Sequence, residues 1–298
     1  MKLSILLASY NQQKHLRESL DSIFLQDLPF AFEIIVADDN STDESVTIIE
    51  TRLKKENCIY KILPSSENIG ISKNYQRAFA ACSGEYIVIL EADDYWTDKD
   101  RIKKHIAFLD AHPWCAMSFN SITFYFEQQQ SFYTHEWKNT EDYEYYSTAQ
   151  LAKTNPIGNL SACVLRNAAV KKLPKELFDL KIADWILGMA MGLQGPLARL
   201  KDPMSVYRIS GSGEWAGMSQ HEKNSKTITL IDTYNKFFDY KFDKEFSAHK
   251  NKLLAEENKV DELTSETAAN RPGWLVKLIR LLIPIRLKAY ICKKLSRQ

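Results

Sequence analysis

The stretch of sequence that decides the fold is YIVILEADDYW, residues 86–96. It begins with an apolar run, Tyr86 to Leu90, that is typical of a strand buried on both faces, and acidic residues follow directly. The same change from an apolar run to polar residues follows residues 3–8 and residues 32–37. Because parallel strands place their ligands beyond their carboxyl ends, we expect these polar residues to line one common site.

Segments with helical periodicity lie between these apolar runs. Apolar residues at helical spacing predict helices over residues 15–25, 43–53, 71–81 and 98–110, and another short apolar run covers residues 59–63. We expect Ser41 or Thr42 to cap the second helix. Strands that alternate with helices through short links predict an α/β fold with a mostly parallel, doubly wound central sheet flanked by helices.

The pattern changes after Pro113, where aromatic and β-branched residues become frequent. Strands are expected in residues 115–126, a loop or edge strand over 128–146, and a loop that enters a strand over 155–166. We then expect a helix over 184–193, a strand entering a Gly-rich loop over 204–215, helical structure over 227–255 and a polar linker over 256–270. The last two predict a C-terminal helical extension of the sheet.

The net charge of +1 hides an uneven distribution along the chain. Residues 271–298 carry eight Lys or Arg and no acid, a charge of +8, which leaves −7 on the rest. Because the basic charge is confined to one terminal segment, the sequence predicts no nucleic-acid partner. Leu275, Leu278 and Leu282 recur at helical spacing in that segment. We expect a basic amphipathic tail that lies on an anionic membrane surface; the alternative is a helix packed on the acidic body.

The cysteines and the hydropathy of the sequence indicate where in the cell the protein is found. The five cysteines are odd in number and include no CxxC pair, which argues against a disulfide framework and indicates a reducing compartment. No uncharged apolar stretch reaches the roughly 18 residues of a membrane span. The sequence predicts a cytoplasmic protein, held peripherally on the inner face of the cell membrane by residues 271–298.

The carboxylates that follow the apolar runs are candidate ligands. Glu91, Asp93 and Asp94 can hold a divalent cation together with substrate phosphates, or serve only as a helix cap and solvated surface acids. Asp38 and Asp39 can accept hydrogen bonds from a base or ribose, or only close a turn. Neither a GxGxxG nor a GxxxxGK[ST] motif is present, which argues against a dinucleotide dehydrogenase and a P-loop NTPase.

Two residues in the second half of the chain are also candidate site residues. Asp184 precedes Trp185 in an apolar helical stretch. It is either the N-cap of that helix or a general base whose basicity is raised by desolvation. Trp215, beside the Gly-rich loop, is the aromatic residue best placed for a ligand contact, whereas most other aromatics of this half are expected to pack in the core or on edge strands.

Taken together, these segments resemble the family 2 glycosyltransferases, which have the A-type nucleotide-sugar transferase fold. The resemblance covers residues 1–215, and its motifs are weak singly but specific in this order. The matching stretches are Ser4 to Asn11, Glu33 to Asp43, Asn68 to Gly70, Ser83 to Trp96, Ala183 to Trp185, and Tyr207 with Arg208.

The resemblance implies an inverting glycosyltransferase of the bacterial surface-polysaccharide type. Such an enzyme moves a sugar from a nucleotide-diphosphate sugar to a hydroxyl of a glycan or lipid-linked acceptor, with Mn²⁺ or Mg²⁺ as cofactor. By resemblance Asp184 is the catalytic base, Asp93 and Asp94 are the metal-binding pair, and Arg208 belongs to the loop that closes over the diphosphate. The nucleotide-binding residues that it implies are Ala8, Ser9, Tyr10, Asn11, Asp39 (with Asp38 as its alternative), Asn68 and Asp93.

The resemblance also divides the chain and shows two departures. Residues 1–110 are implied to be the nucleotide-sugar-binding half and residues 111–225 the acceptor-binding half of one catalytic domain, followed by the helical extension with its linker (226–270) and the tail (271–298). Glu91 stands where many relatives have an aspartate. Ser210 stands where relatives often have a histidine, so the third metal ligand is open; phosphate oxygens and water are expected to complete the shell, and His221 is the less favoured alternative.

Two other functions fit parts of the pattern. A nucleotidyltransferase would also use a metal–carboxylate site, but it has no need of the motifs around Asp184 and Arg208. A non-catalytic, membrane-associated nucleotide-sugar binder would need neither a base nor a metal, and the joint presence of Asp93, Asp94 and Asp184 argues against it.

Overall fold

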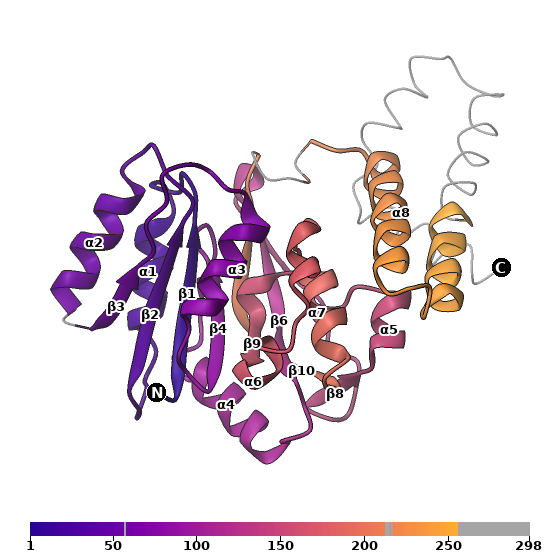
Figure 1. Ribbon diagram of the computed structural model, residues 1–298, viewed down its shortest axis with the longest axis horizontal. Helices are drawn as coiled ribbons and strands as arrows, with labels where there is room; N and C mark the ends of the chain where they lie inside the picture. The colour runs from indigo at the N-terminus through magenta and orange to yellow at the C-terminus, as the bar shows by residue number, and fades with distance from the viewer. Residues whose placement is uncertain (57, 212–214, 216, 256–298) are drawn as a thin grey trace.

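The computed structural model describes residues 1–56, 58–211, 215 and 217–255 as one large sheet with helices on both faces (Figure 1). The predicted linker and tail beyond residue 255 lie outside the described residues. The strands are β1 (Leu3–Ser9), β2 (Phe32–Asp38), β3 (Ile59–Ile62), β4 (Tyr86–Glu91), β5 (Tyr95–Trp96), β6 (Met117–Phe126), β7 (Ser131–Thr134), β8 (Tyr143–Tyr146), β9 (Cys163–Arg166) and β10 (Leu197–Ile209). The α-helices are α1 (Leu16–Phe24), α2 (Ser45–Glu56), α3 (Ile71–Ala81), α4 (Arg101–Ala111), α5 (Thr148–Lys153), α6 (Asn167–Val170), α7 (Asp184–Gly192) and α8 (Gln220–Phe237), with short 3-10 helices η1 (Glu127–Gln129), η2 (Leu160–Ala162) and η3 (Lys175–Asp179).

The strands form a mixed sheet in the order β3-β2-β1-β4-β9-β6-β10-β5. β1 pairs in parallel with β2 and β4, and β2 with β3, so the parallel arrangement predicted for the first 110 residues is confirmed. β9 runs antiparallel between β4 and β6, whereas β6 and β10 are again parallel. β7 and β8 pair antiparallel with β6 and β10 and are the edge strands expected within residues 128–146.

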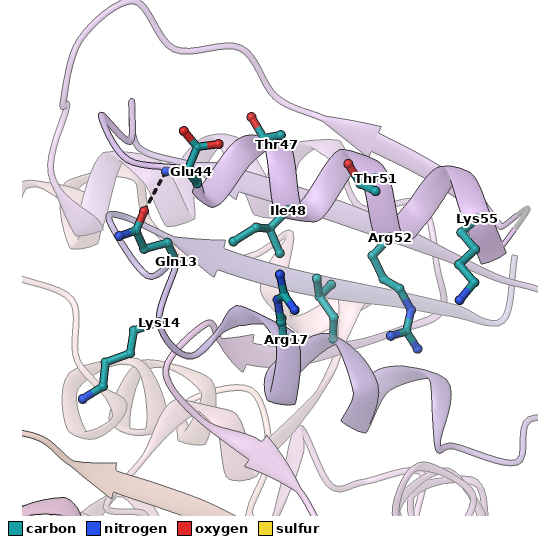
Figure 2. Close-up of a pocket in the computed structure, with 10 residues that line it drawn as sticks. Gln13, Lys14, Arg17, Glu44, Thr47, Ile48, Thr51, Arg52 and Lys55 are labelled. Atoms are coloured by element: carbon teal, nitrogen blue, oxygen red, sulfur yellow. Dashed lines mark hydrogen bonds between the residues drawn. The ribbon is translucent and has the colours of Figure 1, made fainter.

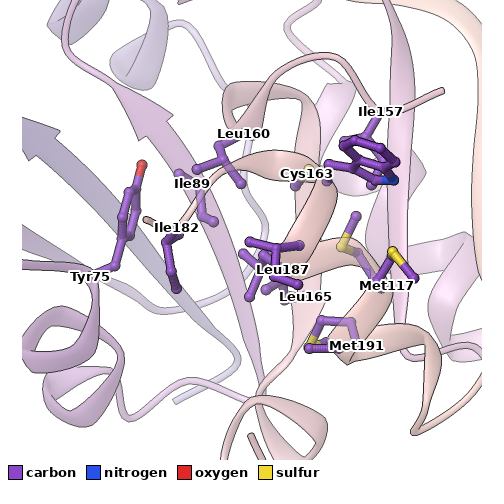
Figure 3. Packing of buried hydrophobic residues seen from close by; sticks show 14 of the residues in the cluster. Tyr75, Ile89, Met117, Ile157, Leu160, Cys163, Leu165, Ile182, Leu187 and Met191 are labelled. Carbon is purple, nitrogen blue, oxygen red and sulfur yellow. The ribbon is translucent and has the colours of Figure 1, made fainter. Parts of the chain in front are cut away.

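Side chains of each strand alternate between two hydrophobic layers. The alternation is clearest in β1, where Leu3, Ile5 and Leu7 face the layer covered by α1, α2 and α4, and Leu6 faces the layer covered by α3, α5, α7 and α8. Figure 3 shows the second layer, in which Leu187 of α7 is fully buried over the sheet. The two layers keep the sheet rigid, so the strand ends are held in fixed relative positions.

The start of α2 differs from the prediction. Ser41 and Thr42 do not cap the helix, because both are bonded to Asn11: the Asn11 N–H donates to Ser41 Oγ at 2.8 Å, and the Thr42 N–H donates to Asn11 Oδ1 at 2.8 Å. The helix begins at Ser45, whose N–H donates to Asp43 Oδ1 at 2.9 Å. The predicted caps instead tie this loop to the end of β1.

Residues 227–255, predicted to be helical, form two helices. α8 ends at Phe237, and a second helix covers residues 243–255. Between them Asp239 and Tyr240 have φ angles of 49° and 58°, a left-handed conformation that ends a helix. The break lets the second helix bury Phe246, which is 1% exposed, against the core. None of the helices in the described residues is both long and apolar enough to cross a membrane.

Candidate functional site

The carboxyl ends of β1, β2 and β4 meet at one edge of the sheet, as predicted. In the pairing of these strands Ser9 lies opposite Asp38, and Ala8 lies opposite Glu91. The pairing continues past β2, because the Asp39 N–H donates to the Ser9 carbonyl at 2.9 Å. Residues from three separate motifs therefore share this edge.

The end of β1 contributes both buried and exposed groups to the edge. Ser9 is buried, and its Oγ has no hydrogen-bond partner among the described residues, so a buried hydroxyl remains to be satisfied there. Tyr10 is 45% exposed, which leaves its ring open to stack on a flat ligand. Asn11 has a left-handed φ of 51°, and its side chain is occupied by the loop before α2. Ala8 is half-buried.

The carboxylate of Asp39 holds the loop before α3. Its Oδ1 accepts the Ile69 N–H and its Oδ2 accepts the Gly70 N–H, both at 2.9 Å. Gly70 has a φ of +83°, which a residue with a Cβ rarely adopts, and this conformation allows two successive amides to face one carboxylate. Asn68 precedes these residues and is exposed. Asp39 therefore fixes the loop that presents Asn68, whereas Asp38 holds the loop around Ser41.

Three carboxylates lie at the end of β4 and just beyond it, and the contacts of Asp93 and Asp94 differ. Asp94 is 1% exposed, and its oxygens accept hydrogen bonds from the Arg208 N–H at 2.9 Å, Ser161 Oγ at 2.7 Å and Asn159 Nδ2 at 2.8 Å. Asp93 is half-buried, and no side chain among the described residues donates a hydrogen bond to its carboxylate. The sheet thus holds Asp94 rigidly and leaves the carboxylate of Asp93 available to a ligand.

Burial and mutual repulsion raise the pKa of these carboxyls. At Glu91 burial is the main cause of a pKa well above the ordinary value, followed by the charges of Asp94, Asp93 and Asp184. Burial, followed by the charge of Asp93, raises the pKa of Asp94 to about 7 against the hydrogen bonds that lower it. Burial also raises the pKa of Asp93. Glu91 is therefore repelled by Asp93 and Asp94 and also by Asp184 at the start of α7, and a bound cation would relieve that repulsion.

The donor set fits a hard divalent cation that takes part of its coordination shell from a ligand. Carboxylate oxygens suit Mg²⁺ and Mn²⁺. Within the part of the chain that the structure describes, no three His, Cys, Asp or Glu side chains are grouped closely enough to hold a metal by themselves. His221, the alternative ligand, is exposed in the first turn of α8. Phosphate oxygens and water would have to supply the remaining ligands.

Arg208 lies beside the acidic group, near the end of β10, and is 7% exposed. Its Nε donates to the Asp93 carbonyl at 2.8 Å, and its guanidinium pairs with Glu18. The guanidinium also lies 5.5 Å from the ring centroid of Tyr95 and 5.3 Å from that of Tyr125. Arg208 is thus anchored to the loop that carries Asp93. The Gly-rich loop after it, residues 212–214, lies outside the described residues.

Asp184 occupies the first position of α7, whose N-cap is Ala183, so the interpretation of Asp184 as the cap does not hold. Burial raises the pKa of the Asp184 carboxyl, although Asn155 Nδ2 donates to its Oδ2 at 2.9 Å and lowers it. Asp184 lines a cavity of about 330 Å³ together with Trp215 and side chains of α8. The predicted base and the predicted aromatic contact therefore face one cavity.

Sequence reasoning missed several residues of this site. Asn159 and Ser161 lie at the start of η2 and within it, where no motif marks them, yet both bond to Asp94. In the sequence Tyr207 stands out only as the neighbour of Arg208. Burial, followed by the charges of Glu91, Asp94, Asp93 and Asp184, raises the pKa of the Tyr207 hydroxyl.

A larger hollow of about 790 Å³ lies elsewhere, between α1 and α2 (Figure 2). It is lined by mostly polar side chains of these helices and of the residues just before them, together with Leu20 and Ile48. Figure 2 shows the Glu44 N–H donating to Gln13 Oε1, at 3.0 Å. Among its basic residues Arg52 is paired with Asp21 and Glu56. None of the carboxylates described above lines this hollow, so the candidate site is the edge at the strand ends.

A family model described as glycosyl transferase family 2 matches residues 4–173, which is more than half of the chain. The chain belongs to glycosyl transferase family 2. The family match spans β1 to β4, Glu91 to Asp94, and the loop with Asn159 and Ser161. It ends before Asp184 and Arg208.

Relatives of this family 2 chain include proteins of known and unknown role. An uncharacterized protein of Mycobacterium tuberculosis (strain H37Rv) is 30% identical over 216 residues, 72% of this chain and 60% of that protein. The chain therefore spans 60% of the length of that relative. The poly(ribitol-phosphate) beta-N-acetylglucosaminyltransferase TarS of Staphylococcus aureus (strain Mu50) is 34% identical over 113 residues, 38% of this chain and 19% of TarS.

Solved structures share the fold. Residues 1–349 of S. aureus TarS in complex with UDP-GlcNAc match with a TM-score of 0.59 and 24% identity, over 86% of this chain and 71% of that one. A mannosyltransferase of Pyrobaculum calidifontis in complex with GDP-Man and Mn²⁺ matches with a TM-score of 0.59 and 15% identity, over 97% of this chain and 82% of that one. These matches confirm the α/β, A-type glycosyltransferase fold of this family 2 chain.

Proposed function

We propose that this family 2 chain is a glycosyltransferase that moves a sugar, with inversion, from a nucleotide-diphosphate sugar to a hydroxyl of a glycan or lipid-linked acceptor. The observation that carries the proposal is that Asp93 and Asp94 follow Glu91 at the end of β4, while Asp184, whose charge also raises the pKa of Glu91, lines a cavity. A metal–diphosphate group and a general base are needed together for this reaction. The likeness to TarS supports cell-surface polysaccharide synthesis as its setting.

The donor lies along the edge formed by β1, β2 and β4. Tyr10 stacks on the base, and the nucleotide is also bound by Ala8, Ser9 and Asn11 of β1 and its end, by Asp39 and Asn68, and by Asp93. Two observations support this arrangement. The buried Ser9 Oγ has no hydrogen-bond partner among the described residues, and the Asp39 carboxylate fixes the loop that carries Asn68. The donors bound by TarS and by the Pyrobaculum mannosyltransferase, UDP-GlcNAc and GDP-Man, support a nucleotide sugar.

Asp93 and Asp94 would hold a divalent cation, Mn²⁺ or Mg²⁺, with the remaining ligands supplied by diphosphate oxygens and water. The contacts favour Asp93 as the direct ligand, because Asp94 already accepts three hydrogen bonds from Arg208, Ser161 and Asn159. When bound, such a cation offsets the charge that develops on the departing diphosphate. Arg208 adds a fixed positive charge on the same side, and Trp215 closes the cavity from the loop.

Asp184 performs the proton transfer. Its carboxylate takes the proton of the acceptor hydroxyl as that oxygen forms a bond to the anomeric carbon. The bond from the anomeric carbon to the diphosphate oxygen breaks on the opposite face, and the nucleoside diphosphate leaves with the bonding electrons. Burial makes Asp184 more basic than a surface aspartate, and Asn155 orients its carboxylate.

The functional division of the chain follows from these roles. Residues 1–110 carry the donor side and residues 111–225 the acceptor side of one catalytic domain, with residues 226–270 as helical extension and linker. Residues 271–298, whose charge is +8, hold the protein on the inner face of the cell membrane.

Nucleotide release from a panel of donors tests the proposal. The full chain is incubated with Mn²⁺ and UDP-, GDP-, CDP- and dTDP-linked sugars, and the nucleotide product is identified by chromatography. Nucleoside diphosphate is expected from one donor. A nucleotidyltransferase would instead release pyrophosphate from a nucleoside triphosphate and sugar phosphate, and a non-catalytic binder would release nothing; either result contradicts the proposal.

A further inference from the structure

Arg101 is a fully buried cation that the proposed mechanism does not use. It is the first residue of α4, where the positive end of the helix dipole disfavours a positive charge. Burial lowers the pKa of its guanidinium to about 9, so the group stays charged at neutral pH. No carboxylate in the described part of the chain forms an ion pair with it, and its Nη1 has no hydrogen-bond partner there. A buried charge kept at such a cost to stability is typical of a functional position.

The hydrogen bonds of Arg101 reach two other elements of the fold. Its Nη2 donates to the Ser161 carbonyl of η2 at 2.9 Å, and its Nε donates to Asn120 Oδ1 of β6 at 2.9 Å. The guanidinium lies 4.7 Å from the ring centroid of Trp96, whose Nε1 donates to the same Ser161 carbonyl at 2.9 Å. Two donors, both from the segment that follows Asp94, therefore fix the backbone of Ser161.

The other end of Ser161 holds the acidic motif. Its Oγ donates to Asp94 Oδ2 at 2.7 Å and accepts the Glu91 N–H at 3.0 Å. The carbonyl that Arg101 holds and the hydroxyl that holds Asp94 belong to one residue, so fixing the first restricts the position of the second. Asp94 is 1% exposed, and its orientation depends on hydrogen bonds of this kind.

We propose that Arg101 is a positioning residue for the divalent-cation site: through the Ser161 carbonyl it fixes the hydroxyl that orients Asp94. The inference rests on the proposed function, since it concerns the cation that Asp93 and Asp94 would hold. Packing alone does not require arginine, because a neutral side chain of similar length would avoid the cost of the buried charge. Lysine is no equivalent, because it lacks the planar fork that serves Ser161 and Asn120 and lies over a ring.

The surrounding contacts allow Arg101 to be replaced without stranding its acceptors. In Arg101→Met the Ser161 carbonyl keeps the Trp96 indole as donor. Asn120 Oδ1 keeps His105 Nε2 at 3.2 Å, in the tautomer that carries the proton on that nitrogen. The variant also removes the buried charge, so we expect it to fold with a urea midpoint close to that of the unmodified chain.

Mn²⁺ binding tests the inference without a measurement of turnover. Mn²⁺ alone is titrated into the full chain, and free Mn²⁺ is measured from its electron paramagnetic resonance signal. The proteins compared are the unmodified chain, Arg101→Met, Arg101→Lys, Ser161→Ala and the double variant Arg101→Met with Ser161→Ala. Urea midpoints are measured for each.

Arg166→Met is the matched control. Arg166 also donates to two backbone carbonyls, of Cys115 at 3.1 Å and of Leu109 at 2.9 Å. It lies opposite Tyr86, at the start of β4, whereas the acids lie at the end of that strand. Its loss should lower the urea midpoint and leave the dissociation constant of Mn²⁺ unchanged.

Arg101→Met should raise the dissociation constant of Mn²⁺ about tenfold, as for other residues that orient metal ligands. Arg101→Lys keeps the charge without the fork and should raise it about threefold; it also serves as the test if Arg101→Met does not fold. The double variant should bind Mn²⁺ no more weakly than Ser161→Ala alone, because the hydroxyl through which Arg101 acts is already absent.

The inference is overturned by an unchanged Mn²⁺ affinity in either folded Arg101 variant, or by losses that add in the double variant, which would show that Arg101 does not act through Ser161. Absence of Mn²⁺ binding by the unmodified chain would overturn it as well. Failure of the proposed function gives a different result: no nucleoside diphosphate is released from any donor, whatever the Mn²⁺ titrations show.

Discussion

At the scale of single residues, the sequence locates the acids and the structure locates the groups that hold them. Asp94 and Asp184 stand in recognisable motifs, so both could be predicted. Their partners could not: Ser161 is 67 residues from Asp94 and Asn155 is 29 residues from Asp184, and nothing in the intervening sequence specifies either approach. Local patterns report the secondary structure and not the tertiary contacts that set a carboxyl pKa.

Removing the partner of Asp184 should change the pH dependence of transfer. Asn155→Ala deletes a hydrogen bond to the ionised carboxylate, so the raised pKa of Asp184 should rise further. Activity needs the deprotonated base and is lost as pH falls through that pKa. The acidic limb of the kcat/KM profile should therefore move to higher pH by about one unit. Asn139→Ala, at an exposed position, is the control; an unmoved limb in Asn155→Ala would contradict the role of Asn155.

Ser161 should act through Asp94. Its Oγ donates to Asp94 Oδ2 at 2.7 Å and accepts the Glu91 N–H at 3.0 Å. Ser161→Ala therefore removes one hydrogen bond at each end of the segment from Glu91 to Asp94. The Mn²⁺ concentration for half-maximal activity should rise about tenfold or more, as for other residues that orient metal ligands. Exposed Ser131→Ala serves as the control. An unchanged Mn²⁺ dependence together with lowered stability would show that Ser161 only supports the fold.

At the scale of helices and strands, the predicted bounds are correct where one local sequence signal dominates. α3 has the predicted bounds, because apolar spacing and flanking glycines agree. The cap of α2 was predicted wrongly, because Ser41 and Thr42 bond to the distant Asn11. The break after α8 carries no Gly or Pro; Asp239 and Tyr240 adopt a left-handed conformation, and the following helix buries Phe246. The misplaced cap and the unpredicted break both come from tertiary contacts overriding local preference.

The turn between α3 and β4 should tolerate only glycine at residue 84. A Cβ there would lie 2.4 Å from the Ser4 N and 2.5 Å from the Leu3 carbonyl carbon, both backbone atoms of β1. Gly84→Ala must push β4 from β1 and should lower the free energy of unfolding by about 2–3 kcal/mol, measured by urea titration. In the control, Gly211→Ala, the added Cβ meets only the end of the flexible Gln128 side chain. Equal unfolding midpoints for the two variants would contradict this view of the turn.

At the scale of the whole molecule, charge separates the parts that the proposal assigns to catalysis and to attachment. The acids of the body include Asp93, Asp94 and Asp184, whereas the basic excess is confined to residues 271–298. The fold class and the shared edge at the ends of β1, β2 and β4 could be predicted from the sequence. The antiparallel insertion of β9 between β4 and β6 could not, since short apolar runs do not specify strand direction.

The tail should decide membrane attachment. Each Lys or Arg near an anionic surface contributes about 1 kcal/mol, so the full chain should sediment with vesicles that contain phosphatidylglycerol. A chain ending at residue 270 should remain in the supernatant, and vesicles of phosphatidylcholine alone should bind neither. Equal sedimentation of the full and shortened chains with anionic vesicles would contradict the membrane role of the tail.

The most direct test of the account is Asp184→Asn, measured for both donor binding and transfer. The amide keeps the size and polarity of the carboxylate but cannot take the acceptor proton, so transfer should fall by about 10²-fold or more while the dissociation constant of the donor stays the same. Asp179→Asn, at an exposed aspartate paired with Lys73, should keep full activity. Full transfer by the Asp184→Asn variant would contradict the assignment of Asp184 as the base and with it the proposed mechanism.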